Sequence, residues 1–308
     1  MDATAPLDDQ VRRFIFENRP VRGHWVRLER AWQALRAHAD YPAPVQELLG
    51  EAVVASLLLA ATLKFKGTLT FQLQGDGAVR LLVAQCTHDF RLRAVARYDA
   101  DAVRRLGEFS SGGARFRGLV GHAGRITVTI EAEERGARYQ GVVPLSGESL
   151  AESLEAYFAA SEQLPTTVVL AADAGRIAGL LVQRLPGTAG SDDSEVDAAW
   201  AEAARDMQRI VPAELLEAEA EATLLRGFPR QALRLFRGAP VHFECRCSLD
   251  RVAGVLRALG AGEVRDVLRE QGAVTVTCEF CQRPYRFDAI DIEALFSDVP
   301  AKSPRTLQ

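Results

Sequence analysis

The sequence predicts an α+β protein with three parts: a mainly antiparallel-sheet core domain with packed helices, a helical linker, and a small C-terminal domain built around cysteines. Three observations lead to this expectation. Short runs of alternating apolar and polar residues, separated by turn residues, fill the first part of the chain. Alanine-rich helical spacing follows, and four cysteines then fall in two close pairs. With 308 residues, 48% of them hydrophobic, the chain has room for one large and one small domain.

Strands are expected throughout the core domain, which we place at residues 1–190. Glycine-containing turns such as Gly75-Asp76-Gly77 and Glu134-Arg135-Gly136 separate runs of period-two alternation, which favours antiparallel hairpins. Cys86 falls on one of these runs and is expected to be a small packed residue. The predicted strands are 11–16, 24–28, 68–73, 79–84, 92–98, 125–131, 137–143, 166–171 and 177–185.

Helices are expected at three places in the same domain. The run 45–63, introduced by Pro42 and Pro44, is apolar on nearly all sides and should lie at the centre of the core. A second helix should pass through Trp32 and Leu35. A third should begin at Ser149, with Glu152 as its capping-box partner. The glycine-rich stretches 110–113 and 118–124 lack the strand and helix context of a phosphate-binding loop, and an ordinary loop is predicted there.

A linker is predicted over residues 191–240, after a small, polar boundary at 186–193. Trp200, Ala203, Met207 and Ile210 share one helical stripe, and Pro212 breaks that helix and can begin the next. Many apolar positions are alanine, which buries little area, so we expect a metastable segment that depends on docking to its neighbours. An ordinary helical subdomain is the alternative. Within this linker, acidic residues are concentrated in 192–221 and a group of arginines follows them.

The cysteine pairs predict a metal site. Cys245 and Cys247 are separated by 30 residues from Cys278 and Cys281, and four soft thiolates at such spacing suit one tetrahedral Zn²⁺ per chain. Packed small side chains and two structural disulfides are the alternatives. The polar start of the chain shows no signal-peptide pattern, so we expect a cytoplasmic protein, in which permanent disulfides are disfavoured. His242 is a rival ligand.

The small C-terminal zinc-binding domain is expected over residues 241–296, followed by a flexible tail at 297–308. Strands at 241–244, 274–276 and 285–287 and helices at 249–259 and 263–271 leave it a thin core, so bound metal should supply much of its folding free energy. Four thiolates on one zinc ion carry a net formal charge of about −2. Four nearby arginines could offset that charge: Arg246, Arg251, Arg283 and Arg286.

Charge and motifs limit the classes of function. The net charge is −4, and residues 241–296 hold seven Arg against nine Asp plus Glu, which argues against nucleic-acid binding. The longest apolar stretch, 52–63, is too short to span a bilayer. No Walker A sequence, nucleophile elbow or His-Glu-x-x-His motif occurs, so no enzyme is expected. A zinc-ribbon nucleic-acid binder and a thiol oxidoreductase stay open as alternatives, although no thioredoxin-like βαβ pattern surrounds the cysteines.

The cysteine spacing resembles that of the heat-shock protein 33 family of redox-regulated chaperones, and the resemblance extends over nearly the whole chain. It covers a core hairpin, two later core motifs and a C-terminal signature. These segments read Leu73-Gln74-Gly75-Asp76-Gly77, Tyr139-Gln140-Gly141-Val142-Val143-Pro144-Leu145, Tyr157-Phe158-x-x-Ser161-Glu162-Gln163-Leu164-Pro165, and Val276-Thr277-Cys278-Glu279-Phe280-Cys281 with Tyr285-Arg286-Phe287. Pro229-Arg230-Gln231 stands where the family pattern leads us to expect acidic residues.

The resemblance implies an ATP-independent holdase chaperone. The reduced, zinc-bound form would be inactive. Oxidation would form two disulfides, Cys245–Cys247 and Cys278–Cys281, release zinc, unfold the C-terminal region and accompany dimerisation. The partners would be unfolded or partly unfolded client proteins. We expect apolar linker residues to join the client-binding surface once they are exposed: Trp200, Leu215, Leu224, Leu225 and Phe228.

Overall fold

The computed structural model describes residues 9–107, 112–133, 138–187 and 193–297. The chain forms two compact units, Met1–Glu244 and Cys245–Gln308. Unit 1 contains two six-stranded, mainly antiparallel sheets with helices, and unit 2 combines short helices with a hairpin. The predicted α+β class is therefore confirmed.

The first sheet of unit 1 has the strand order β10-β1-β2-β9-β8, with β11 also paired to β1. The second has the order β12-β5-β4-β3-β6-β7, and its short strand β12 runs parallel to β5. The strands of the first sheet are β1 (Gln10–Phe16), β2 (Val21–Leu28), β8 (Thr166–Ala172), β9 (Ile177–Arg184), β10 (Leu233–Leu235) and β11 (Ala239–Pro240). Those of the second are β3 (Gly67–Gln74), β4 (Val79–Thr87), β5 (Arg91–Tyr98), β6 (Arg125–Ala132), β7 (Arg138–Pro144) and β12 (His242–Phe243).

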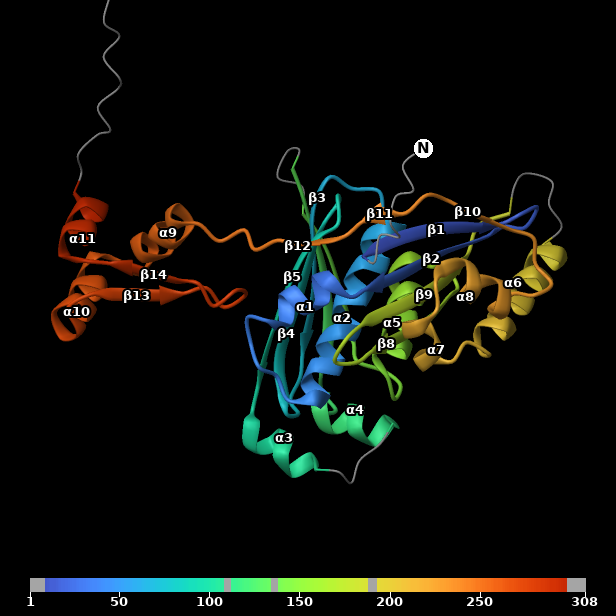
Figure 1. Ribbon diagram of the computed structural model, residues 1–308, viewed down its shortest axis with the longest axis horizontal. Helices are drawn as coiled ribbons and strands as arrows, with labels where there is room; N and C mark the ends of the chain where they lie inside the picture. The colour runs from blue at the N-terminus through green and yellow to red at the C-terminus, as the bar shows by residue number, and fades with distance from the viewer. Residues whose placement is uncertain (1–8, 108–111, 134–137, 188–192, 298–308) are drawn as a thin grey trace, which may run out of the picture. The chain divides into compact units, whose positions relative to one another are not determined.

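Helix α2 (Ala43–Thr62) lies between the two sheets (Figure 1). It begins after Pro42, whose fixed φ suits a helix start, and its side chains are buried on nearly all sides, as its composition predicts. The apolar stretch 52–63 was predicted to be too short to span a membrane, but α2 as a whole is long and apolar enough to do so. However, 83% of its apolar window is buried inside the unit. The helix is therefore the centre of a packed core. Helix α1 (Arg30–Arg36) contains Trp32 and Leu35, as predicted, and buries both. Cys86 is fully buried, as expected for a small packed residue.

The prediction of a loop across the glycine-rich stretches was wrong for residues 112–120, whereas residues 121–124 form a loop as predicted. Residues Gly112–Val120 form helix α4, and the preceding helix α3 (Ala100–Leu106) was not predicted. Phe116, Leu119 and Val120 are buried, and this apolar spacing outweighs the helix-weakening effect of the glycines. Helix α4 ends where Gly121, with φ +80°, donates its N–H to the carbonyl of Arg117. Residues 108–111 lie outside the described residues.

Helix α5 (Leu150–Tyr157) begins at the predicted cap, but only half of the predicted capping box forms. The Ser149 hydroxyl accepts the N–H of Glu152, as expected. The Glu152 carboxylate, however, accepts the N–H of Glu148 and so bonds one residue earlier than a capping box requires. The helix continues into a π-helical turn, η1 (Phe158–Glu162). The turn expected at 134–136 lies outside the described residues.

Three helices of the predicted linker cover the outer face of the first sheet (Figure 1). We call helices α6 (Asp193–Met207), α7 (Pro212–Glu217) and α8 (Ala220–Gly227) the linker layer. They pack on the sheet through a cluster that includes Phe14, Trp25 and Leu180. Gly23 makes room for this packing, because a Cβ there would lie only 2.1 Å from the Phe14 ring. The linker layer thus belongs to the same compact unit as the core.

Unit 2 is built on a small apolar core. It contains α9 (Leu249–Leu259), α10 (Ala261–Gln271), the hairpin of β13 (Val274–Thr277) and β14 (Pro284–Phe287), and α11 (Ala289–Phe296). Helix α11 was not predicted; Asp288 begins it with a capping box to Asp291. Among the described residues, seven buried apolar side chains form the core: Val252, Ala253, Leu256, Val264, Val274, Phe287 and Ile292. Such a core is small for a stable domain. The tail expected at 297–308 lies outside the described residues, apart from Ser297.

Candidate metal centre

Two loops of unit 2 present the four predicted cysteines. Cys245 and Cys247 lie in the irregular segment between β12, which occupies part of the predicted strand 241–244, and α9. Cys278 and Cys281 lie in the turn that joins β13 to β14. This turn is closed by two backbone hydrogen bonds, from Cys278 N–H to the Arg283 carbonyl and from Gln282 N–H to the Cys278 carbonyl. The hairpin therefore fixes the second pair more firmly than the first.

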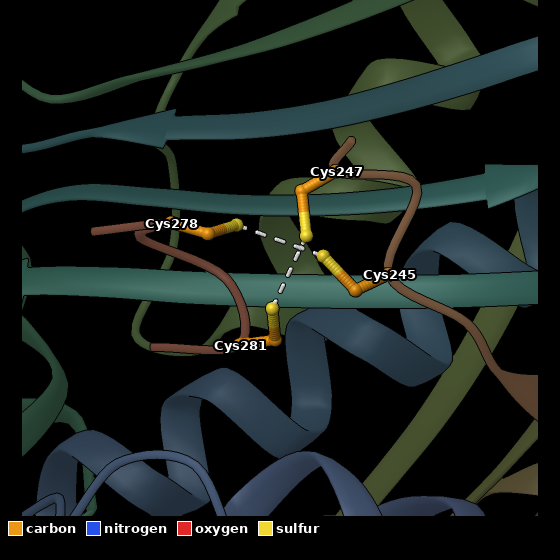
Figure 2. A group of neighbouring side chains, drawn as sticks. All are labelled: Cys245, Cys247, Cys278 and Cys281. Atoms are coloured by element: carbon orange, nitrogen blue, oxygen red, sulfur yellow. Dashed lines mark hydrogen bonds between the residues drawn. The ribbon is translucent and has the colours of Figure 1, made fainter. Parts of the chain in front are cut away.

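The four sulfurs form one compact group (Figure 2). All lie within 4.8 Å of one another; Cys245 and Cys278 are 3.7 Å apart, and Cys247 and Cys281 are 3.4 Å apart. In a tetrahedral site with Zn–S bonds of about 2.3 Å, the sulfurs stand about 3.8 Å apart. The donor set and its spacing therefore fit a metal ion, and four thiolates match the preference of zinc.

Tyr285 and Arg283 place a hydroxyl and a guanidinium beside the sulfur cluster. The Tyr285 hydroxyl donates to the sulfur of Cys247 at 3.1 Å. Burial opposes ionisation of Cys247, but the hydrogen bonds from Tyr285 and the neighbouring thiols outweigh it and lower its pKa to about 7. Burial raises the pKa of Cys281 to about 12. The pKa of Arg283 is raised by its hydrogen bond with Tyr285 and by the charges of Tyr285, Cys247 and Cys281, so this guanidinium is one cation beside the cluster.

The other expected ligands and charges have different roles. His242 pairs with Arg91 in the second sheet of unit 1 and is not in the group of close metal-binding side chains found among the described residues. Arg251 donates to the backbone carbonyl of Arg246, which braces the loop that holds the first cysteine pair. Arg286 pairs with Thr275 in the hairpin of β13 and β14.

Most of the predicted client-binding residues are covered while the linker layer is docked on the first sheet. Leu215, Leu224 and Phe228 are buried between the linker layer and the first sheet, and Trp200 is partly buried against the same apolar cluster. Leu225, in contrast, is 73% exposed. The folded linker layer therefore conceals the apolar residues that its unfolding would expose.

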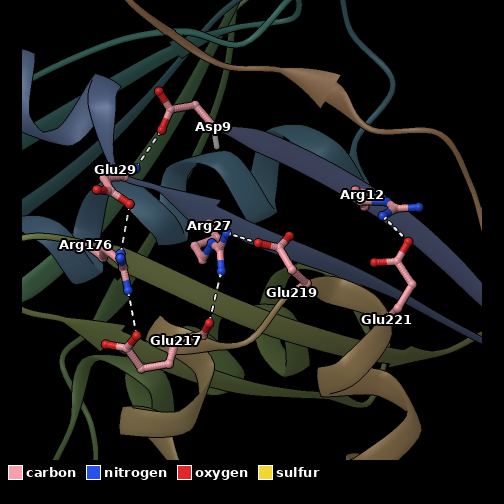
Figure 3. Close-up of polar contacts among 8 residues, drawn as sticks. All are labelled: Asp9, Arg12, Arg27, Glu29, Arg176, Glu217, Glu219 and Glu221. Atoms are coloured by element: carbon pink, nitrogen blue, oxygen red, sulfur yellow. Dashed lines mark hydrogen bonds and ion pairs between the residues drawn. The ribbon is translucent and has the colours of Figure 1, made fainter. Parts of the chain in front are cut away.

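Ion pairs also hold the linker layer on the sheet (Figure 3). The nearly buried Arg27 pairs with Glu219 and donates to the carbonyl of Glu217 at 3.3 Å. Arg12 on β1 and Arg176, which directly precedes β9, also form ion pairs with the linker layer. Arg12 contacts Glu221 at 2.6 Å, and Arg176 contacts Glu217 at 2.6 Å. The acids that crowd the linker sequence therefore have arginine partners on the core.

Sequence reasoning missed the sheet face beneath the layer. Phe14, Phe16 and Trp25 are buried there, together with Leu180 and Val182. A signal was present in the sequence: residues 177–182 form a run without polar side chains, which indicates a strand covered on both faces, and β9 is buried at seven of its eight positions. Helix α2 covers one face of this sheet, and the linker layer, which is more distant in the sequence, covers the other.

Comparison with known proteins identifies the family. The family model described as Hsp33 protein matches residues 9–288. This chain belongs to the Hsp33 family. The curated 33 kDa chaperonin of Nitrosococcus oceani is 41% identical over 97% of both chains, and that of Shewanella woodyi is 42% identical over 97% of this chain and 99% of the relative. Membership of the Hsp33 family supports a chaperone function.

A solved Hsp33 structure has the same fold. The crystal structure of 33 kDa chaperonin (heat shock protein 33 homolog) from Thermotoga maritima superposes with a TM-score of 0.77 and covers 93% of this chain and 97% of that one. Its sequence identity is 23%, so this comparison establishes the fold alone. The family model and the curated relatives confirm the family resemblance predicted from the motifs.

Proposed function

We propose that this Hsp33 protein is a cytoplasmic, redox-regulated holdase that acts without ATP and is not an enzyme. The observation that carries the proposal is the group of four sulfurs within 4.8 Å beside a core of seven apolar side chains. A bound zinc ion would supply folding free energy, about 10–16 kcal/mol in small zinc-finger peptides. So small a core should not stay folded without that contribution.

Oxidation of the sulfurs would remove the ligands. Two thiolates lose two electrons and join through a new S–S bond, while hydrogen peroxide accepts the electrons and two protons and leaves as two water molecules. The family pairing is Cys245 with Cys247 and Cys278 with Cys281. Proximity does not choose this pairing, because all four sulfurs lie within 4.8 Å of one another. A disulfide sulfur is a poor zinc ligand, so oxidation would release the ion.

The client surface would form when the linker layer leaves the sheet. In functional terms we assign residues 1–190 to the core, 191–240 to the linker and 241–296 to the redox domain. Detachment would expose linker residues such as Leu215 and Phe228, together with Phe14, Phe16 and Trp25 on the sheet. Contiguous apolar surface of this kind binds unfolded chains and also favours the proposed homodimer.

One experiment follows zinc and clients together. Reduced protein should contain one zinc per chain and should not suppress aggregation of a thermally unfolding client. During peroxide treatment, zinc release, measured with a chromogenic chelator, should precede suppression of aggregation, and peptide mapping should find the two proposed disulfides. Cys86→Ala should behave as the parent, because Cys86 lies in the core of unit 1. Reduced protein without zinc, or a zinc-stripped protein whose unit 2 keeps its amide protection, would contradict the proposal.

The same preparation separates the other classes of function. Catalytic turnover in insulin reduction would indicate a thiol oxidoreductase, and salt-dependent RNA binding would indicate a nucleic-acid protein. Sedimentation of reduced and oxidised samples tests for the expected dimer.

A further inference from the structure

We propose that Tyr285 is a positioning residue that protects Cys247 from oxidation and strengthens metal binding by hydrogen-bonding to the Cys247 sulfur. This inference rests on the proposed function and concerns how easily the redox centre is opened. It assigns a regulatory role to a side chain that is not itself a ligand.

The hairpin fixes the position of Tyr285. In β14, Tyr285 pairs with Val276 of β13, and the next pair in the register joins Pro284 to Thr277, the residue before Cys278. The tyrosine is therefore held by the same hairpin that carries Cys278 and Cys281. Its hydroxyl reaches Cys247, which is 38 positions away in the sequence, at 3.1 Å. The contact joins the two loops of the centre through a group other than sulfur.

The contact matters because the first cysteine loop has little regular structure. Residues 244–248 belong to no helix or strand. The Tyr285 hydroxyl therefore adds a fixed anchor to the irregular loop that carries Cys247. Restricting this loop before the metal binds lowers the entropic cost of assembling the four ligands.

The chemistry gives the hydrogen bond a direction of effect. An O–H donor withdraws electron density from a thiolate and so lowers its nucleophilicity toward the electrophilic oxygen of peroxide. It also spreads part of the formal charge of about −2 that four thiolates place on a zinc centre. The Arg283 guanidinium lies beside both Tyr285 and the sulfurs and favours the same charge distribution. Tyr285 should thus both tighten metal binding and slow oxidation at one sulfur.

The test compares Tyr285→Phe with the parent protein and with Tyr98→Phe, which removes a phenol hydroxyl from β5 of unit 1. Zinc affinity is measured by competition with a chelator. The reduced, zinc-loaded proteins are then treated with N-ethylmaleimide, and modification of each cysteine is followed by mass spectrometry. Tyr285→Phe should bind zinc about 10-fold more weakly, the usual size of effect for an outer-shell partner. Cys247 should react several-fold faster, and Cys278 should change little.

The ratio of Cys247 to Cys278 reactivity is measured within one molecule, so general loosening of unit 2 would not raise it. Equal acceleration at all four cysteines, or no change in either affinity or rate, would overturn the role of Tyr285 while leaving the proposed function standing. A parent protein that binds no zinc would overturn both. Arg283→Gln keeps the hydroxyl and should raise the ratio less than Tyr285→Phe; an equal or larger rise would assign the effect to the cation.

Discussion

The two faces of the first sheet are covered in different ways. Helix α2 covers one face with apolar side chains such as Leu58, which packs near Gly179. The linker layer covers the other face through apolar contacts and also through ion pairs, such as those of Arg12 and Arg27. The alternation along β9 keeps the two covers separate: Ile177 and Leu181 face α2, and Leu180 faces the linker layer.

This difference indicates which of the two layers, α2 or the linker layer, would detach from the sheet more easily. Apolar packing of α2 between two sheets cannot be undone without unfolding unit 1. The linker layer packs its apolar side chains on one sheet face only, and its partly exposed ion pairs, such as Arg12 with Glu221, contribute little and are screened by salt. Among the described residues, the linker layer also buries polar atoms that lack hydrogen-bond partners, including Asp206 Oδ2 and Thr223 Oγ1. The linker layer is therefore suited to detachment.

Matched core truncations should break this comparison most strongly. Leu58→Ala in α2 and Leu224→Ala in α8 each remove a buried leucine. Both changes should cost about 2–5 kcal/mol. For Leu58→Ala the cost should appear in global unfolding of unit 1. For Leu224→Ala it should appear as opening of α6–α8 alone, measured by hydrogen exchange. Equal loss of protection in α2 and α8 for both variants would mean that the two covers unfold together.

Arg27 tests the polar part of the linker-layer contact. Arg27→Met keeps the aliphatic stem but removes the pair with Glu219 and the bond to the Glu217 carbonyl. The expected loss is about 1–3 kcal/mol of linker-layer stability, since hydrogen bonds to charged groups contribute on this scale. Hydrogen exchange in α7 and α8 measures it. Arg104→Met, which breaks an exposed pair with Asp101 on α3, is the control and should leave those amides unchanged. Unchanged protection in Arg27→Met would assign docking to apolar contacts alone.

Acid should weaken the linker layer before it affects α2. The hydrogen bond from Arg19 lowers the pKa of Glu202 below its usual 4.5. For Glu221, burial raises the pKa, and the bond from Arg12 outweighs it, so that this pKa is also lowered. A carboxyl with a depressed folded-state pKa stabilises the fold above its unfolded pKa, and this contribution is lost as pH falls through the folded value.

Hydrogen-exchange protection of α6 and α8, corrected for intrinsic exchange, should therefore decline as the pH falls below about 4.5. The effect should shrink in the double variant Glu202→Gln and Glu221→Gln. Protection that is constant down to the pH at which α2 also opens would remove these carboxylates from the docking contact.

Local patterns predicted most elements because their causes are local. Helix α9 lies at the predicted residues 249–259, where Ser248 caps it, and the strands differ from their predicted bounds by a few residues. Helix α4 was missed because its stability comes from burying Phe116 and Leu119 against the core, which outweighs the local preference of its glycines. The segment Pro229-Arg230-Gln231 departs from the acidic residues expected there, and the structure gives its arginine a partner. The Arg230 guanidinium lies 3.8 Å from the carboxylate of Glu202 in the linker layer.

The sequence by itself determined the fold class, the central helix and the four cysteines, because alternation, apolar composition and ligand spacing are properties of short segments. Only the tertiary structure decided which surface the linker acids meet, how Tyr285 reaches Cys247 across 38 positions, and that one sheet is covered on both faces. Those facts depend on contacts between segments far apart in the chain. Local spacing does not specify such contacts, since many pairings satisfy the same charges and the same apolar faces until packing selects one.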